Sequence, residues 1–209
     1  MVDAGYIEPT NGQGYVFKGN RYVCIKVIPE TIIDQIKSLV KAGFEKVDAI
    51  IPVPQNKGEI WVFSGTQHAR IDFGNDSIVF GPAPIAENWP SLVKLGFSTI
   101  DAIFPTPGQP NYAYVFNKDK YARITLTPGK PESDIYWGPA AISKHWPNLA
   151  NAGFTAVDTV IPVPGVPSDG YFFQGDQYIR LTVEPDQTQT KVVFGPASVK
   201  KHWPSLDNL

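Results

Sequence analysis

Four aspartates recur in similar local sequences and are the residues best suited to bind a cation. Each precedes a short apolar segment, and successive copies are between 45 and 57 residues apart. If these segments lie around one centre, their backbone carbonyls form a ring of hard oxygen atoms, which suits a Ca²⁺ ion completed by waters. We therefore predict a metal site at Asp3, Asp48, Asp101 and Asp158. The alternative is that the aspartates only begin strands and that any bound ion is structural.

Three histidines are the next candidates, because imidazole is a common ligand of haem iron and of transition metals. His68 stands where other copies carry tyrosine, and His145 and His202 each precede a tryptophan. We expect a surface or hydrogen-bonded structural role for each histidine; the alternative is that a histidine binds haem, for which His68 and His145 are the candidate ligand-binding residues. Trp61 is a further candidate, because it stands where other copies carry tyrosine or phenylalanine, and we expect it to be exposed.

Two other residue types recur at fixed positions. An arginine recurs in a strand-like segment and could form an anion-binding ring, although arginines in repeats more often form ion pairs, which we predict between neighbouring repeats. A tryptophan recurs before proline with helical spacing to apolar residues, which predicts a place in the core. The two sets are Arg70, Arg123 and Arg180, and Trp89, Trp146 and Trp203.

The sequence gives little support for catalysis. It lacks Gly-x-Ser-x-Gly, His-Glu-x-x-His, a glycine-rich phosphate loop and metal-type cysteine–histidine spacing, so we predict that the chain is not an enzyme. A net charge of −2 gives no basic surface for nucleic acid or anionic membranes. The single cysteine, Cys24, forms no intrachain disulfide, and residues 1–6 lack the features of a secretory signal. We predict a cytoplasmic location, with an extracellular one left open.

The chain consists of four copies of one unit. Each copy contains an apolar segment, an aromatic segment, a tight turn and a third alternating segment, which predicts strands joined by a hairpin. Three copies add a fourth strand ending in Gly-Pro-Ala, whereas the first has only the short segment 26–29. Each unit ends in a predicted short amphipathic helix, with an apolar face at i, i+4 and i+7. These faces include Ile85, Trp89 and Leu92, and, in the first copy, Ile32, Ile36 and Leu39.

Four strands and a short helix, repeated four times, predict an all-β fold, a four-bladed β-propeller. Because such repeats bury their faces only against neighbours, we expect one domain. The predicted blades are approximately 3–47, 48–100, 101–157 and 158–209.

These units resemble the hemopexin repeat. The resemblance rests on Asp-Ala before the first strand, the aromatic second strand, Gly-x-x-Tyr-x-Arg across the hairpin and Trp-Pro-x-Leu in the helix, and it covers the full chain. The chain is most similar to the hemopexin-fold seed albumins of legumes. This resemblance implies that carbonyl oxygens at the aspartate positions bind calcium, and that a second axial ion, sodium or chloride, lies two residues later. Those later positions are Gly5, Ile50, Ile103 and Val160.

Two features depart from the family pattern. Extracellular members close the first blade onto the last with a disulfide, which a chain with one cysteine cannot do. In addition, Cys24 stands where the other three copies carry arginine.

The resemblance implies a non-enzymatic protein that binds small ligands, with a structural cation in its central channel. The implied ligands are polyamines such as spermine and haem. A carbohydrate-binding lectin, or a storage or protein-interaction module, is the alternative. We expect a monomer or weak homodimer whose partner is a polyamine, haem or glycan rather than nucleic acid or a membrane.

Overall fold

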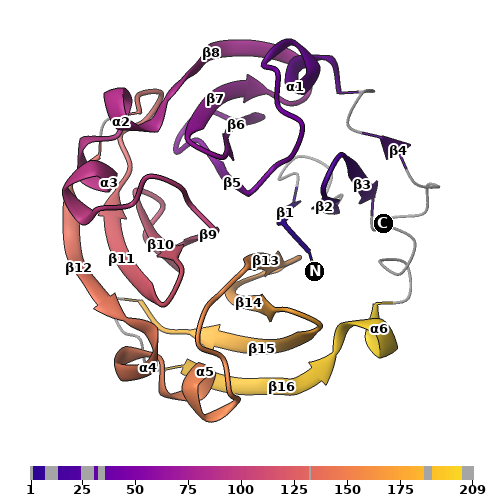
Figure 1. Cartoon of the computed structure of the whole chain (residues 1–209), viewed down its shortest axis with the longest axis vertical. Helices are drawn as coiled ribbons and strands as arrows, with labels where there is room; N and C mark the ends of the chain where they lie inside the picture. The colour runs from indigo at the N-terminus through magenta and orange to yellow at the C-terminus, as the bar shows by residue number, and fades with distance from the viewer. Residues whose placement is uncertain are drawn as a thin grey trace.

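The computed structural model describes residues 2–7, 14–24, 31–32, 36–131, 133–185 and 190–203. These residues form four antiparallel sheets of four strands each, arranged around a common centre (Figure 1). Within each sheet every strand pairs with the next along the chain, and the first strand lies innermost. The prediction of an all-β four-bladed propeller is therefore confirmed.

We number the sheets as blades one to four. Blade one contains β1 (Ala4–Ile7), β2 (Gly14–Lys18), β3 (Arg21–Cys24) and β4 (Thr31–Ile32). Blade two contains β5 (Ala49–Pro52), β6 (Glu59–Ser64), β7 (Gln67–Asp72) and β8 (Ser77–Pro84). Blade three contains β9 (Ala102–Pro105), β10 (Tyr112–Asn117), β11 (Lys120–Thr125) and β12 (Ile135–Ala141). Blade four contains β13 (Thr159–Val163), β14 (Val166–Gln174), β15 (Gln177–Val183) and β16 (Thr190–Ser198).

The innermost strands close the ring. β1 contacts β5 and β13, and β9 contacts the same two strands from the opposite side. Val2 and Val16 of blade one are buried with Ile161 and Phe173 of blade four, so the first and last blades share a hydrophobic core. The segment 26–29, predicted as a shortened strand, lies outside the described residues.

The helices differ from the prediction of one helix per unit. In blades two and three the chain forms two short helices on either side of a tryptophan, because the following proline begins a new helix. Ile32, predicted on the helical face of the first copy, lies in β4. No helix of the described segments is long and apolar enough to cross a membrane. The helices are α1 (Lys37–Lys41), α2 (Ile85–Asn88), α3 (Pro90–Leu95), α4 (Ile142–His145), α5 (Pro147–Asn151) and α6 (Val199–His202).

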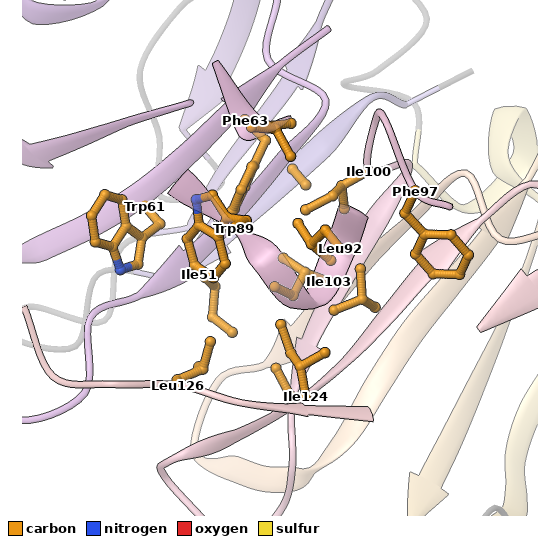
Figure 2. Close-up of a cluster of buried hydrophobic side chains, with 14 of the residues drawn as sticks. Ile51, Trp61, Phe63, Trp89, Leu92, Phe97, Ile100, Ile103, Ile124 and Leu126 are labelled. Atoms are coloured by element: carbon orange, nitrogen blue, oxygen red, sulfur yellow. The ribbon is translucent and has the colours of Figure 1, made fainter. Parts of the chain in front are cut away.

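The helices nevertheless bury the predicted apolar face. Ile85, Trp89 and Leu92 are at most 1% exposed and pack in the core between blades two and three, together with Ile103 and Ile124 (Figure 2). Burial of such side chains contributes about 1.5–3 kcal/mol each. The core positions predicted for the recurring tryptophans are confirmed at the fully buried Trp89 and Trp146, whereas Trp203 is half-buried.

Polar contacts also join α1, α3 and α5 to the outer hairpin of the next blade. The backbone N–H groups of Lys37 and Ser38 donate to the Asp76 carboxylate at 2.8 and 2.9 Å, and the Ser38 hydroxyl donates to it at 2.6 Å. The equivalent pairs at the next two junctions are Ser91 with Ser133 and Asn148 with Thr190. These contacts therefore join neighbouring blades at their outer edges.

Candidate functional site

The channel mouth brings the four recurring aspartates together. A hollow of about 210 Å³ at the centre of the ring is lined by two further residues, Val2 and Lys46, and by Asp3, Asp48, Asp101 and Asp158. Each aspartate directly precedes an innermost strand, so the fourfold repeat places all four at the same end of the channel.

Each aspartate is held by two hydrogen bonds to its own blade. Its backbone N–H donates to the carbonyl of a phenylalanine on the second strand at 2.8–3.0 Å. Its carboxylate Oδ2 accepts a backbone N–H from the following hairpin turn at 2.5–2.6 Å. The donors of this second bond are Gly19, Gly65, Lys118 and Gly175. The aspartate side chains therefore fasten the inner strand to the hairpin and hold the four residues in one geometry.

The hollow is electrostatically unfavourable for its own carboxylates. Burial raises the pKa of Asp101, and the negative charges of Asp158 and Asp48 raise it further, against the hydrogen bond from Lys118. Burial and the charge of Asp48 likewise raise the pKa of Asp3. A cation at the centre would relieve this repulsion, because it favours the charged form of every carboxylate around it.

One cationic side chain already reaches this ring. Lys46 Nζ lies 2.8 Å from Asp48 Oδ1, and the Lys46 side chain is 55% exposed. The hydrogen bond to Asp48 raises the pKa of the Lys46 ammonium, and the charges of Asp48, Asp3 and Asp101 add to this effect. An ammonium group therefore fits the edge of the hollow. The sequence analysis missed Lys46, since it is not repeated in the other copies.

The second predicted ring lies further along the same strands. Ile50, Ile103 and Val160 are at most 6% exposed and belong to the hydrophobic cores between blades. Gly5, the fourth member, lies against Ile161 of blade four so closely that a Cβ on Gly5 would be 2.3 Å from Ile161 Cγ1. These positions hold the blades together at the axis.

The candidate ligand His68 is completely buried. Its ring is surrounded by Trp61, Phe63, Phe80 and Trp89, with ring centroids 5.4–6.2 Å away. Neither ring nitrogen has a hydrogen-bond partner, and burial lowers the pKa of His68 to about 4. His68 is therefore a neutral core residue.

The expected exposure of Trp61 is wrong. Trp61 is 1% exposed and packs edge-on against Trp89 at 5.5 Å, because the α2–α3 segment covers it. Exposed aromatic residues lie instead on the outermost strands of blades three and four, where Tyr136 and Trp137 are 52% and 41% exposed and Phe194 is 43% exposed. The half-buried His145 contacts Trp137 at 4.9 Å between ring centroids. The position of Tyr136 and Trp137 on the outermost strand of a blade could have indicated their exposure.

The recurring arginines do not form a ring or pair between blades as predicted. Arg70 pairs with Glu59 at 3.3 Å and Arg180 with Asp169 at 2.7 Å, each on an adjacent strand of the same blade. Arg123 is 3% exposed, hydrogen-bonded within blade three and stacked on tyrosine rings at 4.6–5.6 Å. These arginines brace individual blades. In addition, Arg70 donates to the Gly129 carbonyl of blade three.

A second hollow lies at the outer edge between blades two and three. It has a volume of about 510 Å³ and is lined by Ala86, Glu87, Asn88, Pro90, Val93, Lys94, Lys130 and Pro131. It is a shallow groove with both charge signs, and neither His68 nor His145 lines it.

Comparisons with known proteins agree with this architecture. No protein-family model matches the chain. Albumin-2 of Pisum sativum is 26% identical over 98% of this chain and 94% of its own length. The structure of a 2S albumin seed protein from Dolichos is 25% identical, with a TM-score of 0.85 over 100% of this chain and 98% of that one. A hemopexin fold protein from cow pea is 23% identical, with a TM-score of 0.85 over 100% and 97%.

The chain has the hemopexin fold of the legume seed albumins. A further structure with this fold is a plant lectin with two metal binding sites from Cicer arietinum, which is 24% identical with a TM-score of 0.83 over 100% of this chain and 98% of that one. The similar proteins named above are thus albumins, a hemopexin fold protein and a lectin.

Proposed function

We propose that this hemopexin-fold chain is a non-enzymatic binding protein whose axial channel holds a cation at the mouth formed by the four aspartates. The observation that carries the proposal is the convergence of four acidic residues, one from each blade, on a hollow of about 210 Å³. Burial and mutual repulsion raise the pKa of Asp3 and Asp101, so the protein alone leaves the ring under-neutralised.

The chemistry of the hollow fits a hard cation such as Ca²⁺. Within the described ranges, no cluster of three or more His, Cys, Asp or Glu side chains could hold a metal, and each aspartate carboxylate is already fastened to a hairpin turn. The backbone carbonyls of Asp3, Asp48, Asp101 and Asp158 would then supply the direct ligands, with the carboxylates supplying charge. A second ion beside Gly5, Ile50, Ile103 and Val160 stays a prediction.

The same mouth is our proposed site for an organic cation. The contact between the Lys46 ammonium and Asp48 supports this, because it places a primary ammonium group at the edge of the ring. A polyamine such as spermine would bring several such groups. Ca²⁺ and spermine would then compete for one site.

Calorimetric titration with CaCl2 and with spermine tests the proposal. The variant Asp101→Asn removes a charge from the ring and keeps an oxygen that can accept the Lys118 N–H, whereas Asp134→Asn removes an exposed charge on the outer edge of blade three. We expect Asp101→Asn to weaken both ligands about tenfold or more and Asp134→Asn to leave them unchanged. Absence of binding to the wild type, or equal effects of the two variants, would overturn the proposal.

Haem binding stays a prediction that rests on His68 and His145. The two lie on different blades, in β7 and α4, and His68 is completely buried. A Soret titration with hemin tests it directly, and an unchanged spectrum would remove it.

Glycan binding is a second candidate function, favoured by the exposed Tyr136 and Trp137 on β12. Exposed aromatic faces can stack on sugar rings, and the similar Cicer arietinum protein is a lectin. We expect a glycan array to give binding that Trp137→Ala abolishes and Val193→Ala, on the equivalent strand of blade four, retains. A blank array together with blank cation and hemin titrations would leave a storage or protein-interaction role.

A further inference from the structure

Lys46 breaks the fourfold pattern at the channel mouth. It lies two residues before Asp48, where blades three and four carry Thr99 before Asp101 and Ala156 before Asp158. In blade three, Thr99 accepts hydrogen bonds from an asparagine side chain. Blade two therefore places a cation at a position where blades three and four have a neutral side chain.

The contacts of Lys46 direct its ammonium group to the ring. Nζ lies 2.8 Å from Asp48 Oδ1, while Oδ2 of the same carboxylate accepts the Gly65 N–H. The charges of Asp3 and Asp101 also act on Lys46, although both belong to other blades. Lys46 is the cationic side chain among the residues that line the hollow. It therefore neutralises part of the ring's charge and not only that of Asp48.

The Lys46 side chain is also free to leave. It is 55% exposed, and a lysine is a compact charge on a flexible four-carbon stem, so its ammonium group can move into solvent. A free cation that enters the ring would repel the ammonium group, since two positive charges in the same hollow raise each other's electrostatic energy. Binding of the cation therefore weakens the contact of Lys46 with the ring, and that contact weakens binding of the cation.

We propose that Lys46 is a tethered counter-ion of the aspartate ring, which occupies the channel mouth in the absence of a free cation and must be displaced when one binds. This inference rests on the proposed cation site. Lys46 would then set the affinity of the site: it lowers the affinity for Ca²⁺ and holds the empty ring together. A simple surface ion pair would instead contribute only about 0–1 kcal/mol to stability.

The test compares neutral and charged replacements in calorimetric titrations with CaCl2, after chelator treatment of each protein. Lys46→Met removes the charge and keeps the length of the side chain, Lys46→Thr installs the blade-three residue, and Lys46→Arg keeps the charge. Lys94→Met, on the exposed end of α3, is the matched control. We expect both neutral variants to bind Ca²⁺ at least about tenfold more tightly than the wild type, which corresponds to about 1.4 kcal/mol. Lys46→Arg and Lys94→Met should keep the wild-type affinity.

Thermal unfolding gives an independent readout. In chelator, Lys46→Met should unfold at a lower temperature than the wild type, because the aspartates then repel one another without a counter-ion. In saturating CaCl2 this order should reverse or vanish, whereas Lys94→Met should follow the wild type in both conditions.

The outcomes separate the two proposals. Binding of Ca²⁺ to the wild type and to Lys46→Met with equal affinity would overturn the role of Lys46 and leave the cation site standing. Binding of Ca²⁺ to the wild type that is at least about tenfold weaker than binding to Lys46→Met would support both the site and the displacement. Absence of binding to every variant would overturn both.

Discussion

Closure of the ring depends on a glycine at the junction between the first and last blades, and Gly5→Ala should therefore weaken the whole propeller. A Cβ added to Gly5 would lie 2.3 Å from Ile161 Cγ1, 2.9 Å from its Cδ1 and 3.1 Å from its Cβ. All three atoms belong to the Ile161 side chain, which is 1% exposed and packed in the core shared by blades one and four. Ile161 therefore has little room to move away.

The expected cost follows from two opposing effects. Overpacking a filled core by one methyl group costs about 1–3 kcal/mol. Replacing glycine by alanine within a strand recovers about 0.5–1 kcal/mol, because alanine loses less backbone entropy on folding. Taking the middle of each range, the net loss should be about 1 kcal/mol, which lowers the melting temperature of a domain of this size by about 2–4 °C.

Denaturation followed by near-ultraviolet circular dichroism measures this loss, and Gly74→Ala is the matched control. A Cβ on Gly74 meets only Asp72 Oδ1, at 3.6 Å, which is an ordinary contact. We expect Gly74→Ala to be neutral or slightly stabilising. A Gly5→Ala protein as stable as Gly74→Ala would refute the packing of blade one against blade four.

A double-mutant cycle attributes the effect to Ile161. Ile161→Ala alone should cost about 2–5 kcal/mol, because it leaves a cavity. In the Gly5→Ala, Ile161→Ala double variant the new methyl group occupies part of that space, so the loss should be smaller than the sum of the single losses. Additive losses would show that the two residues are not in contact.

Two further predictions concern ionisable groups of blade two that lie outside the aspartate ring. Burial raises the pKa of Asp76, but hydrogen bonds from Ser38 and Lys37 outweigh this effect and hold the pKa below its usual range. The stabilisation that the ionised carboxylate gives the folded protein is therefore present at neutral pH. Asp76→Asn should cost about 1 kcal/mol at pH 7 in chemical denaturation, and the difference from the wild type should close as the pH falls below 3.8. Burial lowers the pKa of His68 to about 4, so the unfolded chain takes up the proton first as the pH falls from 6.5. The wild type should lose up to about 3 kcal/mol between these pH values relative to His68→Tyr, which installs the residue of the other blades.

Both predictions can fail clearly. A constant difference between Asp76→Asn and the wild type from pH 7 to pH 3 would show that the carboxylate charge does not hold blades one and two together. Parallel stability profiles of His68→Tyr and the wild type would show that His68 takes up its proton equally in the folded and unfolded chains. The slope with pH is the readout for His68, since a change in packing shifts the whole profile.

Most of the fold could be predicted from the sequence because the same local patterns recur in several copies. Aromatic segments separated by turn residues, such as those around Gly65 and Gly175, appear at the same place in each copy, so a weak local pattern becomes a strong one. The break at Trp89 could also have been predicted, because Pro90 cannot continue the preceding helix, although we expected a single helix there.

The errors concern properties that depend on neighbouring blades and on register. Trp61 is buried because α2 and α3 fold over it, and no strand pattern reveals that cover. Arg70 and Arg180 pair within their blades because the hairpin register places Glu59 and Asp169 on the adjacent strand. Lys46 is not repeated, so a search for recurring residues passes over it.

The central claim is that a cation binds on the axis of the propeller at the channel mouth, and a crystal structure in millimolar CaCl2 tests it most directly. We predict a single calcium ion at the channel mouth, with backbone carbonyl oxygens 2.3–2.6 Å away and the Lys46 ammonium group displaced from Asp48. The carbonyls are those of Asp3, Asp48, Asp101 and Asp158. An axis without calcium in such crystals, or calcium bound only at the outer edge of the blades, would contradict the account.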